Sequence, residues 1–411
     1  MAIIKVQKGT KDILPEEMPI WHFMEDTANK IFTKYGAKEI RTPIFEATEL
    51  FARGVGDTTD IVNKEMYTFE KSERSLTLRP ENTAGVVRSF IENGMHRLSA
   101  PVKLWYKGPM FRYERPQAGR QRQFHQVGVE VFGISQPTAD SEVILMAVNY
   151  LSALGLNDLN VEINSLGCPK CREVFKTKLK EAIKPYLSEL CPDCQTRYEK
   201  NPLRLLDCKV PECKEIYGKP EIQKVIQSDY ICEDCAQHFN ELKGYLDNLG
   251  IKYSVNKLLV RGLDYYNRTV FEITSNNLGS QNAVCGGGRY DSLVKNLGGE
   301  DVPAIGFAMG MERLASLIGQ REDVKTTAFV VCNDSLQGIK LTEELRKNGI
   351  TAEFDLTNKK FVKQLEKASK TAKYALIIGE DELAADKVTI KNLETSEQKT
   401  VNRIDVLKEL A

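Results

Sequence analysis

Arginine side chains gather around a predicted hairpin, where they could bind phosphate. Arg112, Arg120 and Arg122 fall within eleven positions, together with Glu114. On an extended strand alternate residues share a face, so Arg112 and Glu114 should point to the same side. Arginine forks bind phosphate oxygens in a bidentate way, so a rigid sheet that presents several of them suits a nucleoside triphosphate. On charge alone, a solvated hairpin would explain the same residues.

Two further groups could recognise a small polar ligand. Gln126, Gly128 and Glu130 alternate with three valines, so an amide and a carboxylate share one face of a predicted strand. Upstream, Glu81 and Thr83 follow a proline in a predicted turn, where a carboxylate and a hydroxyl could receive an ammonium group. An exposed sheet face and ordinary turn polarity are the alternative interpretations.

Glycines flank the remaining candidate residues. Arg261 ends a predicted strand and is followed by a glycine and then by Tyr265 and Tyr266, while a run of three glycines precedes Tyr290 by two positions. Glycine lets a backbone approach a ligand closely. Arg313 lies where a glycine-containing strand turns into a helix, and its guanidinium could stack on an aromatic base. The glycine runs match neither the Walker loop nor a dinucleotide fingerprint, and tight turns or plain packing are the alternatives.

The elements that must position these residues can be inferred from apolar spacing. A helical pattern ends at Gly36, and short alternating segments then predict strands, which cover residues 76–79, 103–107, 110–113 and 123–132. The last two should form a long hairpin with a polar, basic tip over 115–119. A helix is expected over 140–154. After Arg321, apolar strands near 329–331, 352–354 and 375–378 alternate with helices, which is typical of a small α/β domain.

Composition limits how this chain could bind nucleic acid or a membrane. Lys+Arg and Asp+Glu both number 57, so any affinity for nucleic acid must come from local patches. The sequence predicts neither a membrane span nor a signal peptide. A cytoplasmic location is therefore expected, and the ten cysteines are interpreted as thiols or metal ligands before disulfides.

Eight cysteines concentrate in one mainly helical stretch. Three CxxC pairs and one wider pair make up the set: Cys168, Cys171, Cys191, Cys194, Cys208, Cys213, Cys232 and Cys235. Paired thiolates at this spacing are the usual donors of tetrahedral Zn²⁺, and eight could complete one or two structural sites. The alternative is a set of buried or redox-silent thiols. Residues 166–250 hold 14 Lys/Arg against 14 Asp/Glu, which argues against a strong basic patch in this stretch.

The motifs together resemble those of a known family. The hairpin segment GPMFRYERPQAGRQRQFHQVGVEVFG resembles motif 2 of class II aminoacyl-tRNA synthetases, and GFAMGMERL is similar to their motif 3. LVRGLDYYNRTVFE and GGGRYD resemble the two peptides peculiar to histidyl-tRNA synthetases. LTLRPENTAG and the opening KGTKDILP fit the same family, so the resemblance, to the bacterial type, covers nearly the whole chain.

The resemblance implies an α+β fold: an antiparallel-sheet catalytic core with a mainly helical insertion and a C-terminal α/β anticodon-binding domain. The implied boundaries are 1–165 for the first part of the catalytic domain with motifs 1 and 2, 166–250 for the cysteine-rich insertion, 251–321 for the second catalytic part, and 326–411 for the anticodon-binding domain. It also implies a homodimer, with the N-terminal helix and the segment Arg41-Thr42-Pro43 near the interface.

The same resemblance implies roles for the candidate residues. Arg261 and Arg112 would be catalytic, with Arg261 bridging the histidine carboxylate and the α-phosphate that Arg112 grips. The implied ATP-binding residues are Arg112, Glu114, Arg120, Arg122, Phe124 and Arg313. The implied histidine-binding residues are Glu81, Thr83, Gln126, Glu130, Tyr265, Tyr266 and Tyr290.

The expected activity is the ATP- and Mg²⁺-dependent activation of L-histidine and its transfer to the 3′ end of tRNA(His). A non-catalytic, histidine-sensing regulatory subunit of ATP phosphoribosyltransferase is the main alternative. Such subunits generally lack the C-terminal domain and lose motif arginines, whereas Arg112, Arg261 and Arg313 are all present here. A non-enzymatic RNA-binding protein is a third interpretation, which would leave the ligand-binding residues unexplained.

Overall fold

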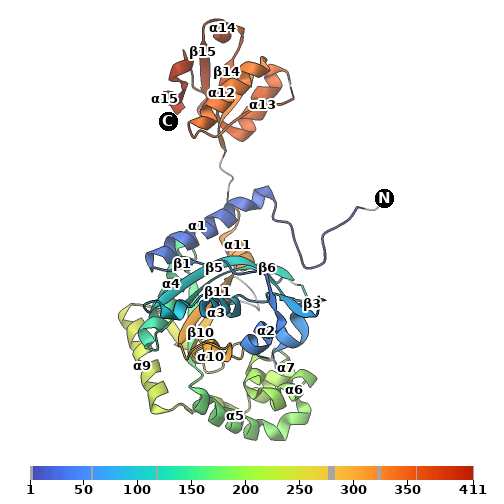
Figure 1. Ribbon diagram of the computed structural model, residues 1–411, viewed down its shortest axis with the longest axis vertical. Coiled ribbons are helices and arrows are strands. Elements are labelled where there is room, and N and C mark those ends of the chain that lie inside the picture. The colour runs from blue at the N-terminus through green and yellow to red at the C-terminus, as the bar shows by residue number, and fades with distance from the viewer. Residues whose placement is uncertain are drawn as a thin grey trace. The chain divides into compact units, whose positions relative to one another are not determined.

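The computed structural model describes residues 3–56, 59–116, 119–275, 283–321, 325–357 and 359–410. The chain forms two compact units, Met1–Arg321 and Glu322–Ala411 (Figure 1). The predicted hairpin tip includes residues 117 and 118, which lie outside the described residues.

An eight-stranded sheet forms the centre of the first unit. Its strands lie in the order β1 (Lys38–Glu39), β5 (Val102–Phe111), β6 (Gln123–Phe132), β11 (Ala304–Gly310), β10 (Ala283–Arg289), β9 (Asn267–Ser275), β7 (Leu159–Ser165) and β8 (Tyr253–Val255). The two edge pairs are parallel and the five inner pairs are antiparallel. The predicted α+β fold with an antiparallel core is therefore confirmed, and the strands predicted over 103–107 and 110–113 form the single strand β5.

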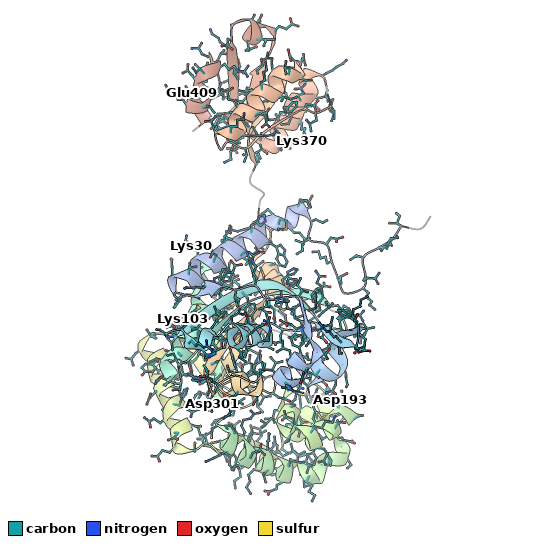
Figure 2. The ribbon with its side chains drawn as sticks, viewed as in Figure 1. Lys30, Lys103, Asp193, Asp301, Lys370 and Glu409 are labelled. Atoms are coloured by element: carbon teal, nitrogen blue, oxygen red, sulfur yellow. The ribbon has the colours of Figure 1, made fainter. Side chains whose placement is uncertain are left out.

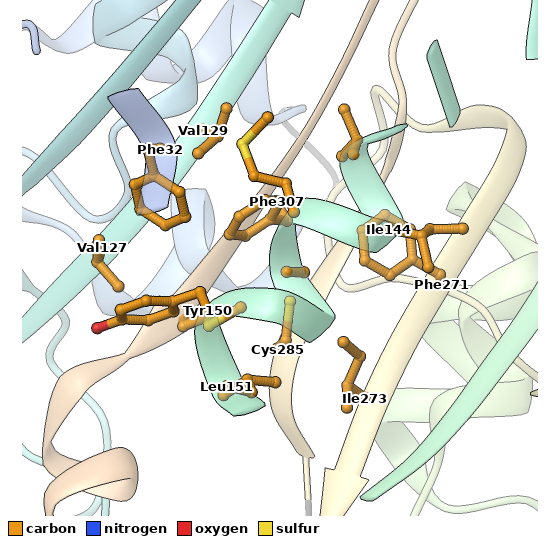
Figure 3. Close-up of a cluster of buried hydrophobic side chains, with 14 of the residues drawn as sticks. Phe32, Val127, Val129, Ile144, Tyr150, Leu151, Phe271, Ile273, Cys285 and Phe307 are labelled. Atoms are coloured by element: carbon orange, nitrogen blue, oxygen red, sulfur yellow. The ribbon is translucent and has the colours of Figure 1, made fainter. Parts of the chain in front are cut away.

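One face of this sheet is buried under helices. Helices α1 (Met18–Lys34) and α4 (Pro137–Ala153) pack against it, together with α9 (Glu233–Asn248) and α11 (Met311–Ile318). Figure 3 shows Phe32 and Tyr150 from these helices beside Val127, Val129 and Phe307 from the strands. Because side chains alternate along β6, burial of these valines turns Gln126 and Glu130 to the opposite face, as the sequence predicted.

The opposite face carries a second layer. It contains β2 (Phe45–Ala47), β3 (Tyr67–Lys71), β4 (Arg74–Leu78), α2 (Thr48–Val55), α3 (Thr83–Glu92), α10 (Leu293–Asn296) and the short turns η2 (Ile61–Glu65) and η3 (Met95–Arg97), whereas η1 (Pro15–Glu17) leads into α1 on the first face. The three strands pair in the order β2-β4-β3.

Helix α3 begins where the Glu81 carboxylate accepts the backbone N–H groups of Thr83, at 2.7 Å, and Ala84, at 2.9 Å. A carboxylate at this position satisfies N–H groups that a helix leaves unpaired.

The chain between β7 and β8 folds into helices. These are α5 (Pro169–Ile183), η4 (Lys184–Glu189), α6 (Pro192–Lys200), η5 (Pro202–Asp207), α7 (Pro211–Tyr217), α8 (Pro220–Gln227) and α9. Proline opens α5 to α8, where its missing N–H costs no helical hydrogen bond. Ion pairs connect this region to the second layer: Asp193, labelled in Figure 2, pairs with Lys64 at 3.1 Å, and Arg197 pairs with Asp60 at 2.8 Å.

A fully buried ion network joins the insertion to the sheet. Arg289 Nε lies 2.6 Å from Asp140 Oδ1, and neither side chain is exposed. The other Asp140 oxygen contacts His238 Nε2 at 2.7 Å and accepts the Thr269 hydroxyl at 2.6 Å. A buried charge is tolerated only when it is paired and hydrogen-bonded, so this network fixes α4, α9, β9 and β10 relative to one another.

The second unit is an α/β domain. Its sheet has the order β13 (Ala352–Phe354), β12 (Thr326–Cys332), β14 (Ala372–Ile378), β15 (Lys387–Asn392) and β16 (Gln398–Asn402), with parallel pairs β12–β13 and β12–β14. Helices α12 (Ser335–Lys347) and α13 (Phe361–Thr371) cover opposite faces, because Val330 packs with α12 and Phe329 and Val331 pack with α13. The unit ends with α14 (Glu380–Ala384), η7 (Arg403–Asp405) and α15 (Val406–Leu410).

Within the described ranges, no helix combines the length and the apolar character that crossing a membrane requires.

Candidate active site

A cavity of about 560 Å³ lies against the polar face of the eight-stranded sheet. Most of the predicted ATP and histidine residues line it: Glu81, Arg112, Glu114, Arg120, Phe124, Gln126, Arg261, Tyr265, Tyr266 and Arg313. The insertion also contributes to the wall through Arg204, Leu206, Asp207 and Lys209. The volume falls in the range of small-molecule sites.

One end of the cavity carries cations held in fixed directions. Arg112 Nε donates to the Pro80 carbonyl at 2.8 Å, and its guanidinium lies 5.3 Å from the centre of the Phe124 ring. Arg120 pairs with Glu114 at 3.0 Å. Arg313 Nη1 donates to the Ala283 carbonyl at 2.6 Å. Burial, and then the nearby Arg120, lower the pKa of Arg313 below its ordinary value. A polyphosphate bound here would relieve this repulsion.

Arg261 lies deeper, against the glycine-rich strand β10. Its Nη1 atom contacts Glu272 Oε2 at 2.5 Å, and Gly286 pairs with Glu272 across β9 and β10. A Cβ built on Gly286 would lie 1.8 Å from Arg261 Nη2. No side chain other than hydrogen therefore fits at position 286 while the guanidinium keeps this place.

Two acceptors near Arg112 could receive an ammonium group. Glu81 is 3% exposed, and its burial raises the pKa of the carboxyl, while the charge of Arg112 lowers it. Gln126 Oε1 is buried and has no hydrogen-bond partner among the residues that the structure describes. A buried amide oxygen without a partner costs free energy, so a ligand that donates a hydrogen bond there is favoured.

Glu130 forms the centre of a buried layer behind the cavity wall. Its carboxylate accepts the hydroxyls of Thr83, at 2.8 Å, Tyr106, at 3.3 Å, and Tyr290. These four residues are not part of the cavity wall. Gly306 lies opposite Glu130 on β11, and a Cβ there would meet Glu130 Oε2 at 1.8 Å. Thus the structure brings Thr83, Glu130 and Tyr290 together, and two tyrosines of the wall lie beside them.

The tyrosines connect this layer to the cavity. The ring centres of Tyr265 and Tyr266 are 4.6 Å apart, and those of Tyr265 and Tyr290 are 5.5 Å apart. Tyr106 was missed in the sequence analysis, although it pairs with Gly128 across β5 and β6. A Cβ at Gly128 would lie 2.5 Å from the Tyr106 hydroxyl, which explains the glycine between Gln126 and Glu130.

The protonation of Glu130 gives a testable pH dependence. Burial is the largest cause that raises its pKa from 4.5 to about 8, against the hydrogen bonds that lower it. Between pH 4.5 and about pH 8, the Glu130 carboxyl is ionised in the unfolded chain but stays protonated in the folded chain. The folded protein is therefore stabilised by keeping this proton. That contribution to the free energy of unfolding is full below about pH 4.5 and is lost as the pH rises towards 8. We predict that Glu130→Gln becomes more stable relative to the unmodified protein across this window, by up to about 1.4 kcal/mol per pH unit.

Urea unfolding at pH 5, 6, 7 and 8 would measure this difference in the free energy of unfolding. Glu49→Gln is the matched control, since it makes the same chemical change at a side chain that is 65% exposed. A pH-independent difference for Glu130→Gln would contradict the raised pKa.

Arg122 is the predicted ATP residue that the structure does not bring to the cavity wall. Its Nε donates to the Glu114 carbonyl at 3.3 Å, and its guanidinium lies 3.9 Å from the centre of the Tyr113 ring. Gly9 packs directly against its side chain. These contacts place Arg122 at the base of the hairpin, against the N-terminal segment. The eight cysteines of the insertion also lie outside the cavity wall.

The fold and the site together define a class. An antiparallel sheet with an arginine-bearing hairpin and an arginine at a strand-to-helix turn is the arrangement of class II aminoacyl-tRNA synthetases. A family model described as histidyl-tRNA synthetase matches residues 9–176 and 213–314, and one described as anticodon binding domain matches residues 328–411. The chain belongs to the histidyl-tRNA synthetase family.

Individual relatives agree with this assignment. The chain is 49% identical over 410 residues to the histidine–tRNA ligase of Acetivibrio thermocellus, with 97% of each chain covered. It is 50% identical over 406 residues to the histidine–tRNA ligase of Desulfitobacterium hafniense, with 96% of this chain and 95% of the relative covered. The crystal structure of apo S. aureus histidyl-tRNA synthetase superposes with a TM-score of 0.81 at 37% identity, covering 99% of this chain and 100% of that one.

Proposed function

We propose that this chain is a histidine–tRNA ligase, which activates L-histidine with ATP and transfers the histidyl group to the 3′ end of tRNA(His). The observation that carries the proposal is a single cavity that joins phosphate-binding arginines to acceptors for an ammonium group. The family assignment supports the same activity. The regulatory-subunit alternative is less supported, because Arg112, Arg261 and Arg313 all line the cavity and the second unit matches an anticodon-binding domain.

ATP would occupy the end of the cavity that carries Arg112, Arg120 and Arg313. We assign Arg112 to the α-phosphate, Arg120 to the outer phosphates, and Arg313 with Phe124 to the two faces of the adenine. Carboxylates of Glu114 and Glu272 line the same cavity and are of the type that Mg²⁺ accepts, and each also pairs with an arginine of the site. When bound, Mg²⁺ would neutralise phosphate charge.

Histidine would lie between Arg261 and the tyrosines. We assign its ammonium group to Glu81 and Gln126, where Thr83 holds Glu81 in place through its backbone N–H. Its ring would lie at Tyr265 and Tyr266. Glu130 and Tyr290 lie directly behind that wall, and we assign Glu130 as the acceptor for a ring nitrogen that reaches between the two tyrosines. A site of buried polar partners rejects analogues that lack the matching groups, so high selectivity would need no editing domain.

The reaction needs alignment more than a protein nucleophile. A carboxylate oxygen of histidine attacks the α-phosphorus and forms the acyl–phosphate bond, while the bond to the β-phosphate oxygen breaks and pyrophosphate leaves. Arg261 would bridge the carboxylate and the α-phosphate and so stabilise the negative charge that builds at phosphorus. A 3′-hydroxyl of tRNA then attacks the histidyl carbonyl, and AMP leaves.

The remaining assignments are part of the same proposal. Residues 1–165 and 251–321 would form the catalytic domain, 166–250 the insertion, and 326–411 the domain that reads the anticodon, supported by the family match over 328–411. We also propose a homodimer and a cytoplasmic location, the latter supported by ten free cysteines in place of disulfides.

Charging of a tRNA(His) transcript with labelled histidine tests the complete activity. We expect acid-precipitable label that depends on ATP, Mg²⁺ and tRNA(His), and none with a transcript of another specificity. Histidine binding without any charging would instead favour the regulatory subunit.

A further inference from the structure

The cysteines of the insertion form two separate groups of four. The proximal group contains Cys168, Cys171, Cys232 and Cys235, and the distal group contains Cys191, Cys194, Cys208 and Cys213. Within each group all four sulfur atoms lie within 4.8 Å of one another. We propose that each group holds one structural Zn²⁺ ion, and that the distal ion positions the part of the active-site wall that the insertion supplies.

The sulfur spacing matches a single tetrahedral ion. Four Zn–S bonds of about 2.3 Å place the sulfur atoms about 3.8 Å apart. The Cys168 and Cys171 sulfurs are 3.5 Å apart, and those of Cys191 and Cys208 are 3.9 Å apart. These distances are far longer than a disulfide bond. An iron–sulfur cluster with several irons binds its cysteines to different metal atoms and would separate them further.

The local backbone favours thiolates at these positions. Cys168, Cys191 and Cys232 occupy the residue directly before the helices α5, α6 and α9, and the second cysteine of each CxxC pair lies in the first turn. The positive end of a helix stabilises negative charge. Backbone N–H groups also donate to sulfur: Cys168 to Cys235 Sγ at 3.2 Å, Cys232 to Cys171 Sγ at 3.0 Å, and Cys191 to Cys213 Sγ at 3.3 Å. Such donors orient and neutralise metal-bound thiolates.

The proximal group joins the two ends of the insertion. Its first pair begins α5, directly after β7, and its second pair begins α9, which returns to the sheet. An ion here would close a long loop at its base. Binding free energy of such an ion is folding free energy for the segment that it closes.

The distal group lies beside the active-site wall. Cys208 follows η5 directly, and Arg204, Leu206, Asp207 and Lys209 on either side of it line the cavity. Tyr217 donates its hydroxyl to Cys194 Sγ at 3.3 Å, so α7 is tied to the same group. The segment is built from the short elements η5, α6 and α7, and Cys194, Cys208 and Cys213 lie in one buried cluster with Leu205, Ile216 and Tyr217. An ion bound by four of its side chains would hold the backbone at 204–209 in place.

Metal content of the full-length protein, purified after growth with zinc, tests the two sites without reference to activity. We expect two zinc ions per chain. The variants Cys168→Ser/Cys171→Ser and Cys191→Ser/Cys194→Ser should each lose one, while Cys332→Ser in the second unit is the matched control and should keep both. Less than half a zinc per chain in the unmodified protein, or a zinc content that neither double variant lowers, would overturn the proposal.

Cobalt substitution keeps the test independent of whether a variant folds. The unmodified protein loaded with Co²⁺ alone should show the intense thiolate-to-cobalt charge-transfer absorption of a tetrahedral four-sulfur site, with an amplitude for two ions per chain. The absence of this absorption would overturn both sites.

The positioning role of the distal ion rests on the proposed function, and a separate activity measurement tests it. Histidine-dependent pyrophosphate exchange should fall about 10- to 100-fold in the variant Cys191→Ser/Cys194→Ser, provided that it retains its proximal zinc. Small displacements of the residues that position a substrate lower the reaction rate by such factors. Unchanged exchange in that variant would overturn the positioning role and leave the metal sites standing. No exchange in the unmodified protein would count against the proposed function, whatever the metal content.

Discussion

Replacing Arg261 with alanine should slow the formation of histidyl-adenylate by about 10³-fold, a far larger effect than its weakening of histidine binding. The guanidinium lies at the cavity wall and is held by Glu272 at 2.5 Å, so its direction is fixed before the substrates arrive. A fixed cation acts on charge that develops in the transition state, and its removal typically costs two to three orders of magnitude or more. Arg261→Lys keeps the charge but not the planar fork, so we expect an intermediate loss.

Single-turnover rapid quench would measure adenylate formation, and equilibrium dialysis would measure the Kd for histidine. Arg53→Ala is the matched control, because the Arg53 side chain is 60% exposed in a surface helix pair. An equal loss in rate and in histidine affinity would show that Arg261 is a binding residue only, since an interaction made equally in the ground state does not accelerate the chemical step.

Gly286→Ala should reproduce most of the Arg261→Ala defect, although it removes no functional group. The added methyl would lie 1.8 Å from Arg261 Nη2 and must displace the guanidinium. Residue 286 has no positive φ angle, so alanine is compatible with the backbone of β10. The variant should therefore fold and lose adenylate formation by about 10²- to 10³-fold.

The same kinetic assay should be combined with thermal unfolding. Gly244→Ala is the matched control, since a Cβ there meets nothing within 4 Å and activity should not change. The double variant Gly286→Ala/Arg261→Ala should be no slower than Arg261→Ala alone, because both changes remove the same interaction. Losses that multiply in the double variant would show that Gly286 acts through another group.

Alternation along β6 was enough to predict which residues of that strand face the site. The valines of residues 127–131 pack under α1 and α4, and Gln126 and Glu130 turn the other way. By contrast, the same argument was less useful for Arg122. Strand β5 ends at Phe111 and β6 begins at Gln123, so the arginine lies in irregular chain where side-chain direction has no fixed period.

Contacts between segments that are distant in the sequence could not be predicted from local sequence patterns. Tyr106 joins Glu130 only because β5 and β6 pair in the register that places Tyr106 opposite Gly128. Likewise, three CxxC pairs and one wider pair allow several groupings, and only the folded insertion brings Cys208 and Cys213 to Cys191 and Cys194. The insertion residues of the cavity wall carry no motif of their own, so the sequence offered no signal for them.

Exchange of labelled pyrophosphate into ATP, run without tRNA across the twenty amino acids, tests the central claim most directly. Adenylate formation is reversible, so exchange reports activation of the amino acid alone. We predict exchange with histidine and with no other amino acid, dependent on Mg²⁺. No exchange with histidine, despite measurable histidine binding, would contradict the proposed activity and favour a histidine-sensing regulatory subunit.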